Sequence, residues 1–339
     1  MGMYASESLC RSWMKTPDFL LLLLGRYVLY ACAVMGRIDP SFIERFGTHV
    51  DAIFHDIAHS TNGDSRVWSG SNMFFPLSRH KSWFDGHSFA TGMFPFATGK
   101  SQESSSEAVN SYYGAYLWSL VRHGGSALPS ESTDFTSLLL AMEIRSAKMY
   151  WHMIPSNSLS NNSVTQGVYP AQFQQNLMVG NVGMLDVTAN TWFGSDPLYV
   201  HMINAIPITA ATAVLFDENY VGYEYPYLMG SRTRSVEMAW RGYTVSIHSI
   251  INANSAWKEA QDLVSYELDA ALSKSQVLYF ISGRPSFNVS VSVSEAVPSQ
   301  TNLTNDSALC LSHLNCHAAN LTGLCCPTSD NQFLSCCDW

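Results

Sequence analysis

The sequence predicts an all-α domain that is followed by a linker and a small cysteine-rich module. Three observations support this organisation. Apolar residues recur at helical spacing over most of residues 38–282, with Gly-, Ser- and Asn-rich loops between the segments. Residues 286–308 are rich in Ser, Thr, Asn and Val and lack a helical period. Six of the eight cysteines lie within residues 309–339. With 339 residues, 47% of them hydrophobic, the chain can bury a sizeable core and still carry an appendage.

Residues 1–26 form a divergent N-terminal segment that resembles a secretion signal. Arg11 and Lys15 precede a leucine run at residues 20–24, and the Ala-Cys-Ala of residues 31–33 resembles a cleavage site. Arg26 interrupts the apolar run, however, and Glu7 is unusual in the charged region of a signal. A functional signal and a divergent start of the domain are therefore both open interpretations.

Two segments of the predicted domain, residues 27–285, have the clearest helical pattern. Residues 138–151 show a wide apolar face. Within residues 256–272, Trp257, Ala260 and Val264 share one apolar stripe, and Asn254 or Ser255 is expected to cap the helix. Residues 156–167 are polar and predict a loop between helices.

The cysteine-rich module, residues 309–339, is too short to support itself with a core of its own. Three disulfides among its six cysteines are the natural solution. Zinc is the competing interpretation, but adjacent cysteines do not converge on one ion as the thiols of a CxxC motif do. Five sequons, three of them from residue 302 onward, favour a secreted, extracellular or cell-wall glycoprotein with disulfides; they begin at Asn161, Asn288, Asn302, Asn305 and Asn320.

The charge balance excludes several classes of partner. Charged residues make up only 13% of the chain, and 18 Lys and Arg oppose 27 Asp and Glu, which gives a net charge of −9. Nucleic acids and anionic membranes need concentrated positive charge, so neither is expected as a partner. The sequence contains no run of about 18 apolar residues, so no transmembrane helix is predicted. An enzyme or a binding protein for neutral polar ligands fits this composition.

Two short motifs suggest other chemistry but are incomplete, and a third is absent. Gly99-Lys100-Ser101 resembles the end of a phosphate-binding loop, but Phe94 stands where its first glycine is required. His55 and His59 have the spacing of a zinc protease, but Asp replaces the general-base Glu and no third ligand is evident. No GxSxG motif marks a serine esterase. We therefore expect neither a metal nor a cofactor.

A pair of carboxylates is the most informative motif. Glu103 and Glu107 lie four residues apart in the run Gln-Glu-Ser-Ser-Ser-Glu-Ala, so both can face one site. The same run fits a capping box in which Ser104 is the N-cap and Glu107 reaches back to it. Glu103 would then lie on a loop end, where catalytic groups often occur. Aromatic residues near the pair suit the stacking of sugar rings, although such residues more often belong to a core.

Four blocks of the sequence resemble glycoside hydrolase family 81, the endo-β-1,3-glucanases of fungi, oomycetes, plants and some bacteria. They are residues 79–90, the Gln-Glu-Ser-Ser-Ser-Glu-Ala run at 102–108, residues 143–152, and residues 186–194. The resemblance extends from about residue 27 to residue 284. The six-cysteine tail resembles an extension of oomycete-type members.

The resemblance implies an (α/α)6 barrel with a long cleft that hydrolyses β-1,3-glucan with inversion and without a cofactor. Inversion needs a general acid and a general base that are about 6.5–9.5 Å apart. The glutamate pair of the family matches Glu103 and Glu107, of which Glu103 is the expected base and Glu107 supports it or shares the role. The resemblance places further side chains in the cleft: Lys81, Trp83, Asp85, His87, Tyr113, Trp151 and His152.

Two departures from the family pattern bear on activity. Family members carry a β-sandwich and a small connecting domain before the barrel, and their absence here predicts a barrel that is truncated on its N-terminal side. The ungapped position of the family's acid is Leu20, and leucine cannot donate a proton. Asp18 lies two residues away, and Asp85 is the motif carboxylate that could substitute. A catalytically impaired β-glucan-binding protein, or an incomplete barrel that folds poorly, are the alternatives to an active endo-1,3-β-glucanase.

Overall fold

The computed structural model describes residues 18–59, 75–90, 99–122, 131–155, 168–230 and 238–288, with the backbone alone described for residues 18–26 and 238. The chain divides into two compact units, Met1–Phe287 and Asn288–Trp339. Apart from Asn288, the second unit lies outside the described residues, as do the predicted linker from residue 289, the disulfides of the tail and the polar loop at 156–167.

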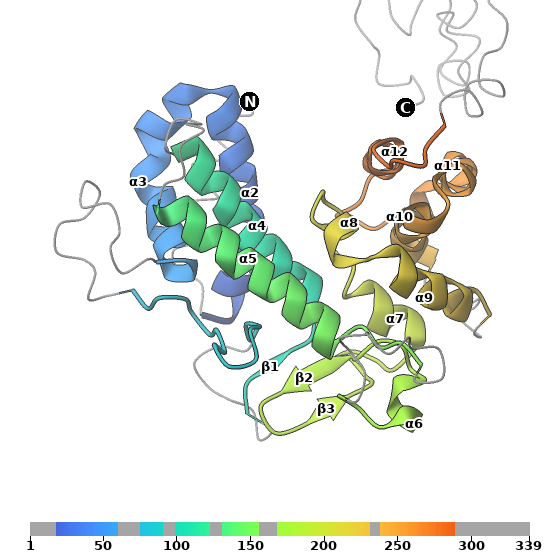
Figure 1. Ribbon diagram of the computed structural model, residues 1–339. Helices are drawn as coiled ribbons and strands as arrows, with labels where there is room; N and C mark the ends of the chain where they lie inside the picture. The colour runs from blue at the N-terminus through green and yellow to red at the C-terminus, as the bar shows by residue number, and fades with distance from the viewer. Residues whose placement is uncertain are drawn as a thin grey trace, which may run out of the picture. The chain divides into compact units, whose positions relative to one another are not determined.

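The first group of helices in the unit Met1–Phe287 comprises α2 (Asp18–Ile38), α3 (Pro40–Ile57), α4 (Ser105–Arg122) and α5 (Glu131–Tyr150). Helix α4 packs against both α2 and α5, and α3 packs against α2 (Figure 1). The α2–α3 corner is sharp because Asp39 caps α3, accepting the N–H of Ser41 at 2.9 Å. Helix α2 runs unbroken across the boundary predicted after residue 26.

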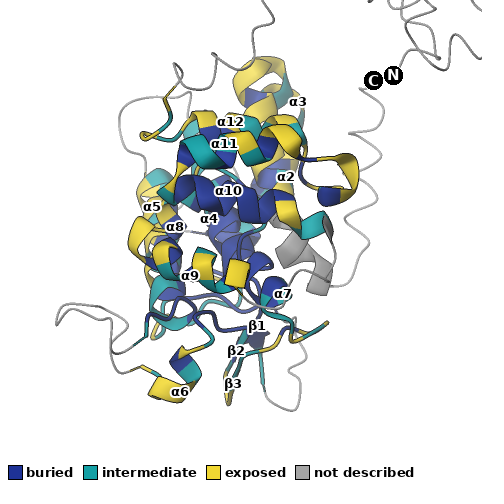
Figure 2. Cartoon of the chain, turned by 90° about the vertical axis from the view of Figure 1, so that its right-hand side faces the viewer, coloured by how far each residue is buried: buried dark blue, intermediate teal, exposed yellow. Residues whose placement is uncertain are grey.

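The second group of helices follows residue 196. It comprises α7 (Pro197–Met202), α8 (Thr212–Leu215), α9 (Glu218–Gly230), α10 (Arg241–Ile251), α11 (Ala253–Asp262) and α12 (Lys274–Ser282), with the 3-10 turns η3 (Met238–Trp240) and η4 (Ser265–Glu267). Helix α10 is buried from residue 242 to residue 250 because α9, α11 and α12 all pack on it (Figure 2). None of the helices in the described part of the chain is long and apolar enough to cross a membrane.

A small antiparallel sheet lies beside the helices and corrects the prediction of a purely helical domain. Strands β1 (Ser101–Gln102), β2 (Asn181–Gly183) and β3 (Val187–Thr188) pair in that order, with Ser101 opposite Gly183. The short helix α6 (Ala171–Gln174) precedes β2. Strands of two or three residues are too short to show the alternating pattern by which a strand is predicted from sequence. The fold is therefore mostly helical rather than all-α.

The two predicted helices have different outcomes. Residues 138–150 lie in α5, as predicted, but the helix predicted over 256–272 is wrong beyond Asp262. Val264 has an extended backbone there, and its N–H donates to Oε2 of Glu267 at 3.0 Å, which stabilises a new turn instead of continuing the helix. The cap also differs, because Asn252 accepts the N–H of Ser255 at 3.0 Å.

Candidate active site

Glu103 lies between strand β1 and helix α4, at the point where two of the motif blocks meet. The N–H of Ala90 donates to the carbonyl of Ser101 at 2.9 Å, which ties the strand to the 79–90 block. The backbone N–H of Trp192, in the 186–194 block, donates to Oε2 of Glu103 at 2.5 Å. The first contact fixes the strand before Glu103, and the second holds its buried carboxyl.

The environment of Glu103 gives its carboxyl an unusual proton affinity. Burial raises its pKa, the N–H of Trp192 opposes the rise and the negative charge of Glu107 adds to it, and the net result is a pKa of about 7. A carboxyl with a pKa near 7 exchanges its proton readily at neutral pH. This is the property required of a general acid or base in a hydrolase.

Glu107 lies on the first turn of α4 and is also buried. Its Oε1 accepts a hydrogen bond of 3.2 Å from the hydroxyl of Tyr27 on α2. The negative charge of Glu107 contributes to the raised pKa of Glu103, so the two carboxyls interact electrostatically.

The start of α4 is held by residues that are distant in the sequence. Ser104 donates its hydroxyl to the carbonyl of Ile203 at 2.7 Å. Both the N–H and the hydroxyl of Ser105 donate to Oδ1 of Asn204 at 2.8 Å. Asn204 is fully buried and lies 99 residues away in sequence, so no local pattern could have identified it.

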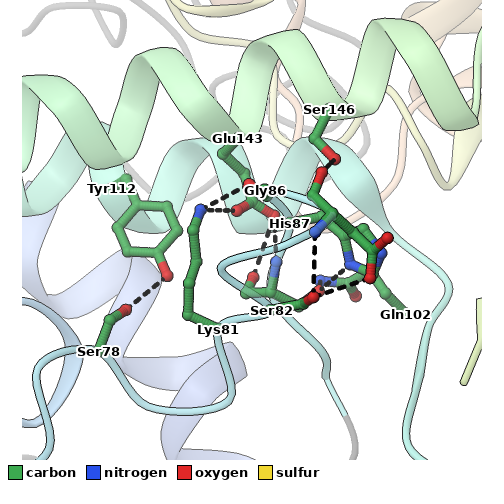
Figure 3. A network of polar contacts seen from close by, with 11 residues as sticks. Ser78, Lys81, Ser82, Gly86, His87, Gln102, Tyr112, Glu143 and Ser146 are labelled. Carbon is green, nitrogen blue, oxygen red and sulfur yellow. Dashed lines mark hydrogen bonds and ion pairs between the residues drawn. The ribbon is translucent and has the colours of Figure 1, made fainter.

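Lys81, which was expected in the cleft, has a buried side chain with two polar partners. Its side chain is 0% exposed, and its Nζ lies 2.8 Å from Oε2 of Glu143 and 2.7 Å from the carbonyl of Gly86 (Figure 3). The other oxygen of Glu143 accepts the N–H of Ser88 at 2.9 Å and its hydroxyl at 3.0 Å. This cluster fastens the turn of residues 81–88 to α5.

The Lys81 cluster also contacts strand β1, which immediately precedes Glu103. The side-chain amide of Gln102 donates to the carbonyl of Ser88 at 3.1 Å (Figure 3). Because Gln102 immediately precedes Glu103, the ion pair supports the candidate base through two intervening residues, Ser88 and Gln102.

The other predicted residues of the 81–90 turn differ in exposure. Trp83 is exposed, and its ring lies 6.5 Å from that of Phe135. Asp85 is half-buried, and its Oδ2 accepts the hydroxyl of Ser82 at 2.8 Å. His87 is buried, with its ring edge-on to that of Trp151 at 5.2 Å.

The two residues of the 143–152 block that were expected in the cleft are both buried. Trp151 is fully buried, and His152 stacks on Tyr220 with ring centroids 4.1 Å apart. Burial lowers the pKa of His152 to about 3, so this imidazole is neutral. Tyr113 on α4 is half-buried and contacts Tyr30, so of the predicted aromatic residues only Trp83 and Tyr113 are open to a ligand.

The histidine pair and the apparent phosphate loop have contacts of their own. The Nδ1 atoms of His55 and His59 are 3.1 Å apart, a hydrogen-bond distance, and burial lowers the pKa of each. The described ranges contain no group of three metal-ligating side chains. Lys100 contacts His80 at 2.9 Å, and the Phe94 position of the apparent phosphate loop lies outside the described residues.

Comparison with known proteins identifies related sequences and one related fold. The profile of the glycosyl hydrolase family 81 C-terminal domain matches residues 24–278. Glucan endo-1,3-beta-D-glucosidase 2 of Saccharomyces cerevisiae is 33% identical over 207 residues, which are 61% of this chain and 24% of the yeast protein. The primary septum glucan endo-1,3-beta-D-glucosidase of Schizosaccharomyces pombe is 27% identical over 242 residues, which are 71% of this chain and 21% of that protein.

A solved structure of a glycoside hydrolase family 81 mutant from Clostridium thermocellum has a similar fold. It superimposes with a TM-score of 0.61 and 23% identity, covering 77% of this chain and 33% of that chain. The chain therefore spans between a fifth and a quarter of the length of the two yeast relatives and a third of this bacterial one.

Proposed function

The chain belongs to glycosyl hydrolase family 81, and we propose that it is an endo-1,3-β-glucanase that hydrolyses β-1,3-glucan with inversion and uses Glu103 as general base. The observation that carries the proposal is the environment of Glu103, which is buried, held by the N–H of Trp192, and has a pKa of about 7. Such a carboxylate can take a proton from an attacking water at neutral pH. Glu107 supports it by keeping that pKa high.

We assign the role of general acid to Asp85, because the position expected from the family holds Leu20, which cannot donate a proton. The side chain of Leu20 lies outside the described residues. The hydroxyl of Ser82 lies 2.8 Å from Oδ2 of Asp85. A hydroxyl can donate to a carboxylate and can also accept from a carboxylic acid, so this contact suits both protonation states that an acid visits.

The wider arrangement follows from family membership. The two helix groups are proposed to belong to an (α/α)6 barrel whose cleft contains Glu103. Secretion or a cell-wall location, and disulfides in the residue 309–339 module, are proposed on the sequons and cysteines of the sequence. Both yeast relatives are glucan endo-1,3-beta-D-glucosidases, which supports β-1,3-glucan as the substrate of this chain.

The test is reducing-sugar release from a linear β-1,3-glucan by the purified chain, beside a pull-down on the insoluble polymer. We expect Glu103→Gln and Asp85→Asn each to lower kcat by about 10²–10⁴-fold, which is the usual contribution of a general acid or base. Glu218→Gln, an exposed glutamate on the first turn of α9, is the matched control and should leave kcat unchanged.

The outcomes separate the candidate functions. Release by the unmodified chain that is lost in Glu103→Gln supports the proposal, and NMR of the first product should show the inverted α-anomer. Release that is undiminished in Glu103→Gln would remove the assignment of the base. Binding to the polymer without release would instead favour the glucan-binding alternative.

A further inference from the structure

Phe193 follows Trp192, whose backbone N–H donates to Glu103, and its ring contacts the rings of Tyr199 and Trp240. Phe193 lies parallel to Trp240, with ring centroids 6.4 Å apart and an angle of 10° between the planes. The ring of Tyr199 lies 5.5 Å from Phe193 and 6.1 Å from Trp240. Together with Trp192, these residues form what we call the aromatic surface.

Two residues of the aromatic surface are much more exposed to solvent than core residues are. Trp192 is 44% exposed and Phe193 is 51% exposed, while Tyr199 and Trp240 are half-buried. Exposed apolar groups that adjoin one another often mark a binding site, whereas single exposed apolar residues do not. The parallel Phe193 and Trp240 rings therefore need an explanation beyond packing.

The turn that carries Trp192 and Phe193 is held firmly. Oγ1 of Thr191 accepts the N–H groups of Phe193 at 3.3 Å and Gly194 at 3.1 Å, and the N–H of Thr191 donates to the carbonyl of Gly194 at 2.8 Å. Gly194 lies so close to Tyr199 that a Cβ atom there would come within 2.9 Å of its ring. Trp192 and Phe193 therefore lie on a hydrogen-bonded turn that packs against Tyr199.

The same turn touches the candidate base. The N–H of Trp192 donates to Glu103 at 2.5 Å, so the aromatic surface begins at the residue that contacts the reacting carboxyl. A polymer whose bond is cleaved at Glu103 must place neighbouring units close to this turn.

We propose that the aromatic surface is a subsite that stacks glucosyl rings of the β-1,3-glucan chain next to the cleavage point. This inference rests on the proposed function for its ligand. A glucosyl ring presents C–H groups on its faces, and these complement the negative faces of aromatic rings. The four side chains carry no charge, which suits a neutral sugar.

Binding is measured first in the Glu103→Gln background, so that the ligand is not consumed, by calorimetry with linear β-1,3-gluco-oligosaccharides. Phe193→Ala and Trp192→Ala should each weaken binding about tenfold, which corresponds to about 1.4 kcal/mol. Both replacements are at exposed side chains, and Trp192→Ala retains the backbone N–H that holds residue 103. Tyr279→Ala, an 81% exposed aromatic residue on α12, is the matched control and should leave the affinity unchanged.

Kinetics in the active chain provide the second readout. Phe193→Ala should lower kcat/KM more for long than for short oligosaccharides, because only the long ones span both the aromatic surface and the cleavage point. The pH profile of Trp192→Ala should stay that of the unmodified chain, which separates loss of a subsite from disturbance of the base.

The failures of the two proposals can be told apart. If the unmodified chain binds oligosaccharides but releases no sugar, and Phe193→Ala still weakens binding, the hydrolase proposal fails and the subsite stands. If hydrolysis is normal and both alanine variants keep the affinity of the Tyr279→Ala control, the subsite is refuted and the hydrolase proposal stands.

Discussion

The buried ion pair between Lys81 and Glu143 gives a sharp prediction about stability. The two side chains are 0% and 2% exposed, so neither charge can be solvated if the other is removed. Breaking such a pair by replacing one partner typically costs about 3–5 kcal/mol of folding free energy. We expect both Lys81→Met and Glu143→Gln to fall within this range.

The contacts around the ion pair determine which of the two variants loses more folding free energy. In Glu143→Gln the ammonium of Lys81 keeps its hydrogen bond to the carbonyl of Gly86 and its contact with the ring of Tyr112, 4.8 Å from the ring centroid. It loses the carboxylate that balances its charge. In Lys81→Met the carboxylate still accepts two hydrogen bonds from Ser88. Hydrogen bonds to a charged group are stronger than neutral ones, so Lys81→Met should cost about 3 kcal/mol and Glu143→Gln nearer to 5 kcal/mol.

The double variant and an exposed pair complete the design. Lys81→Met with Glu143→Gln carries no buried charge and can keep the Ser88 bonds, so it should recover about 2 kcal/mol relative to the sum of the single variants. Lys148 and Asp217, 3.3 Å apart with side chains 33% and 48% exposed, form the control pair. Lys148→Met should cost no more than about 1 kcal/mol.

The assay is urea unfolding followed by tryptophan fluorescence, with the free energy of unfolding extrapolated to water for each variant. A loss below about 1 kcal/mol in both Lys81→Met and Glu143→Gln, equal to that of Lys148→Met, would show that the pair is solvated and would refute the reasoning.

Three further predictions concern the site and its supports. Because the pKa of Glu103 is about 7, the base is ionised only above that pH, and kcat/KM should fall about tenfold per pH unit below it; a plateau that extends to about pH 5 would contradict this. Asn204→Ala leaves two buried donors of Ser105 without their acceptor, so the free energy of unfolding should fall by about 2–4 kcal/mol in urea titrations. Gly180→Ala would bring a Cβ atom within 2.4 Å of the carbonyl oxygen of Asn190, so a thermal scan should show a lower Tm, from a loss of about 1–3 kcal/mol.

Features with a local physical cause were predictable from sequence. The serine run at 104–106 and Glu107 predict that a helix begins directly after Glu103. In the structure α4 begins at Ser105. The apolar face of residues 138–150 likewise predicts a helix, because a periodic pattern reports directly on burial.

Features that depend on distant residues were not predictable. Trp151 and His152 look like ligand-binding groups in isolation, but their place in the core follows from Tyr220 and other residues far along the chain. Periodicity predicted helix through residue 272, but the hydrogen bond from Val264 to Glu267 competes with the helix and ends it early. A pattern of apolar residues does not reveal such a competition.

The serine run at 104–106 shows how one sequence feature can serve a purpose other than the obvious one. Read locally it is a helix cap, but its hydroxyls point away from α4: Ser104 donates to Ile203 at 2.7 Å and Ser106 to Ile206 at 2.5 Å. These buried donors join the first helix group to the second immediately after Glu103. Serine suits this role because its hydroxyl is short enough to bring two backbones together and still satisfy a buried carbonyl. The segment that carries the candidate base is therefore bonded to both helix groups. A substitution that weakens the Ser104 or Ser106 hydrogen bond should change the pKa of Glu103 before it reduces the helix content.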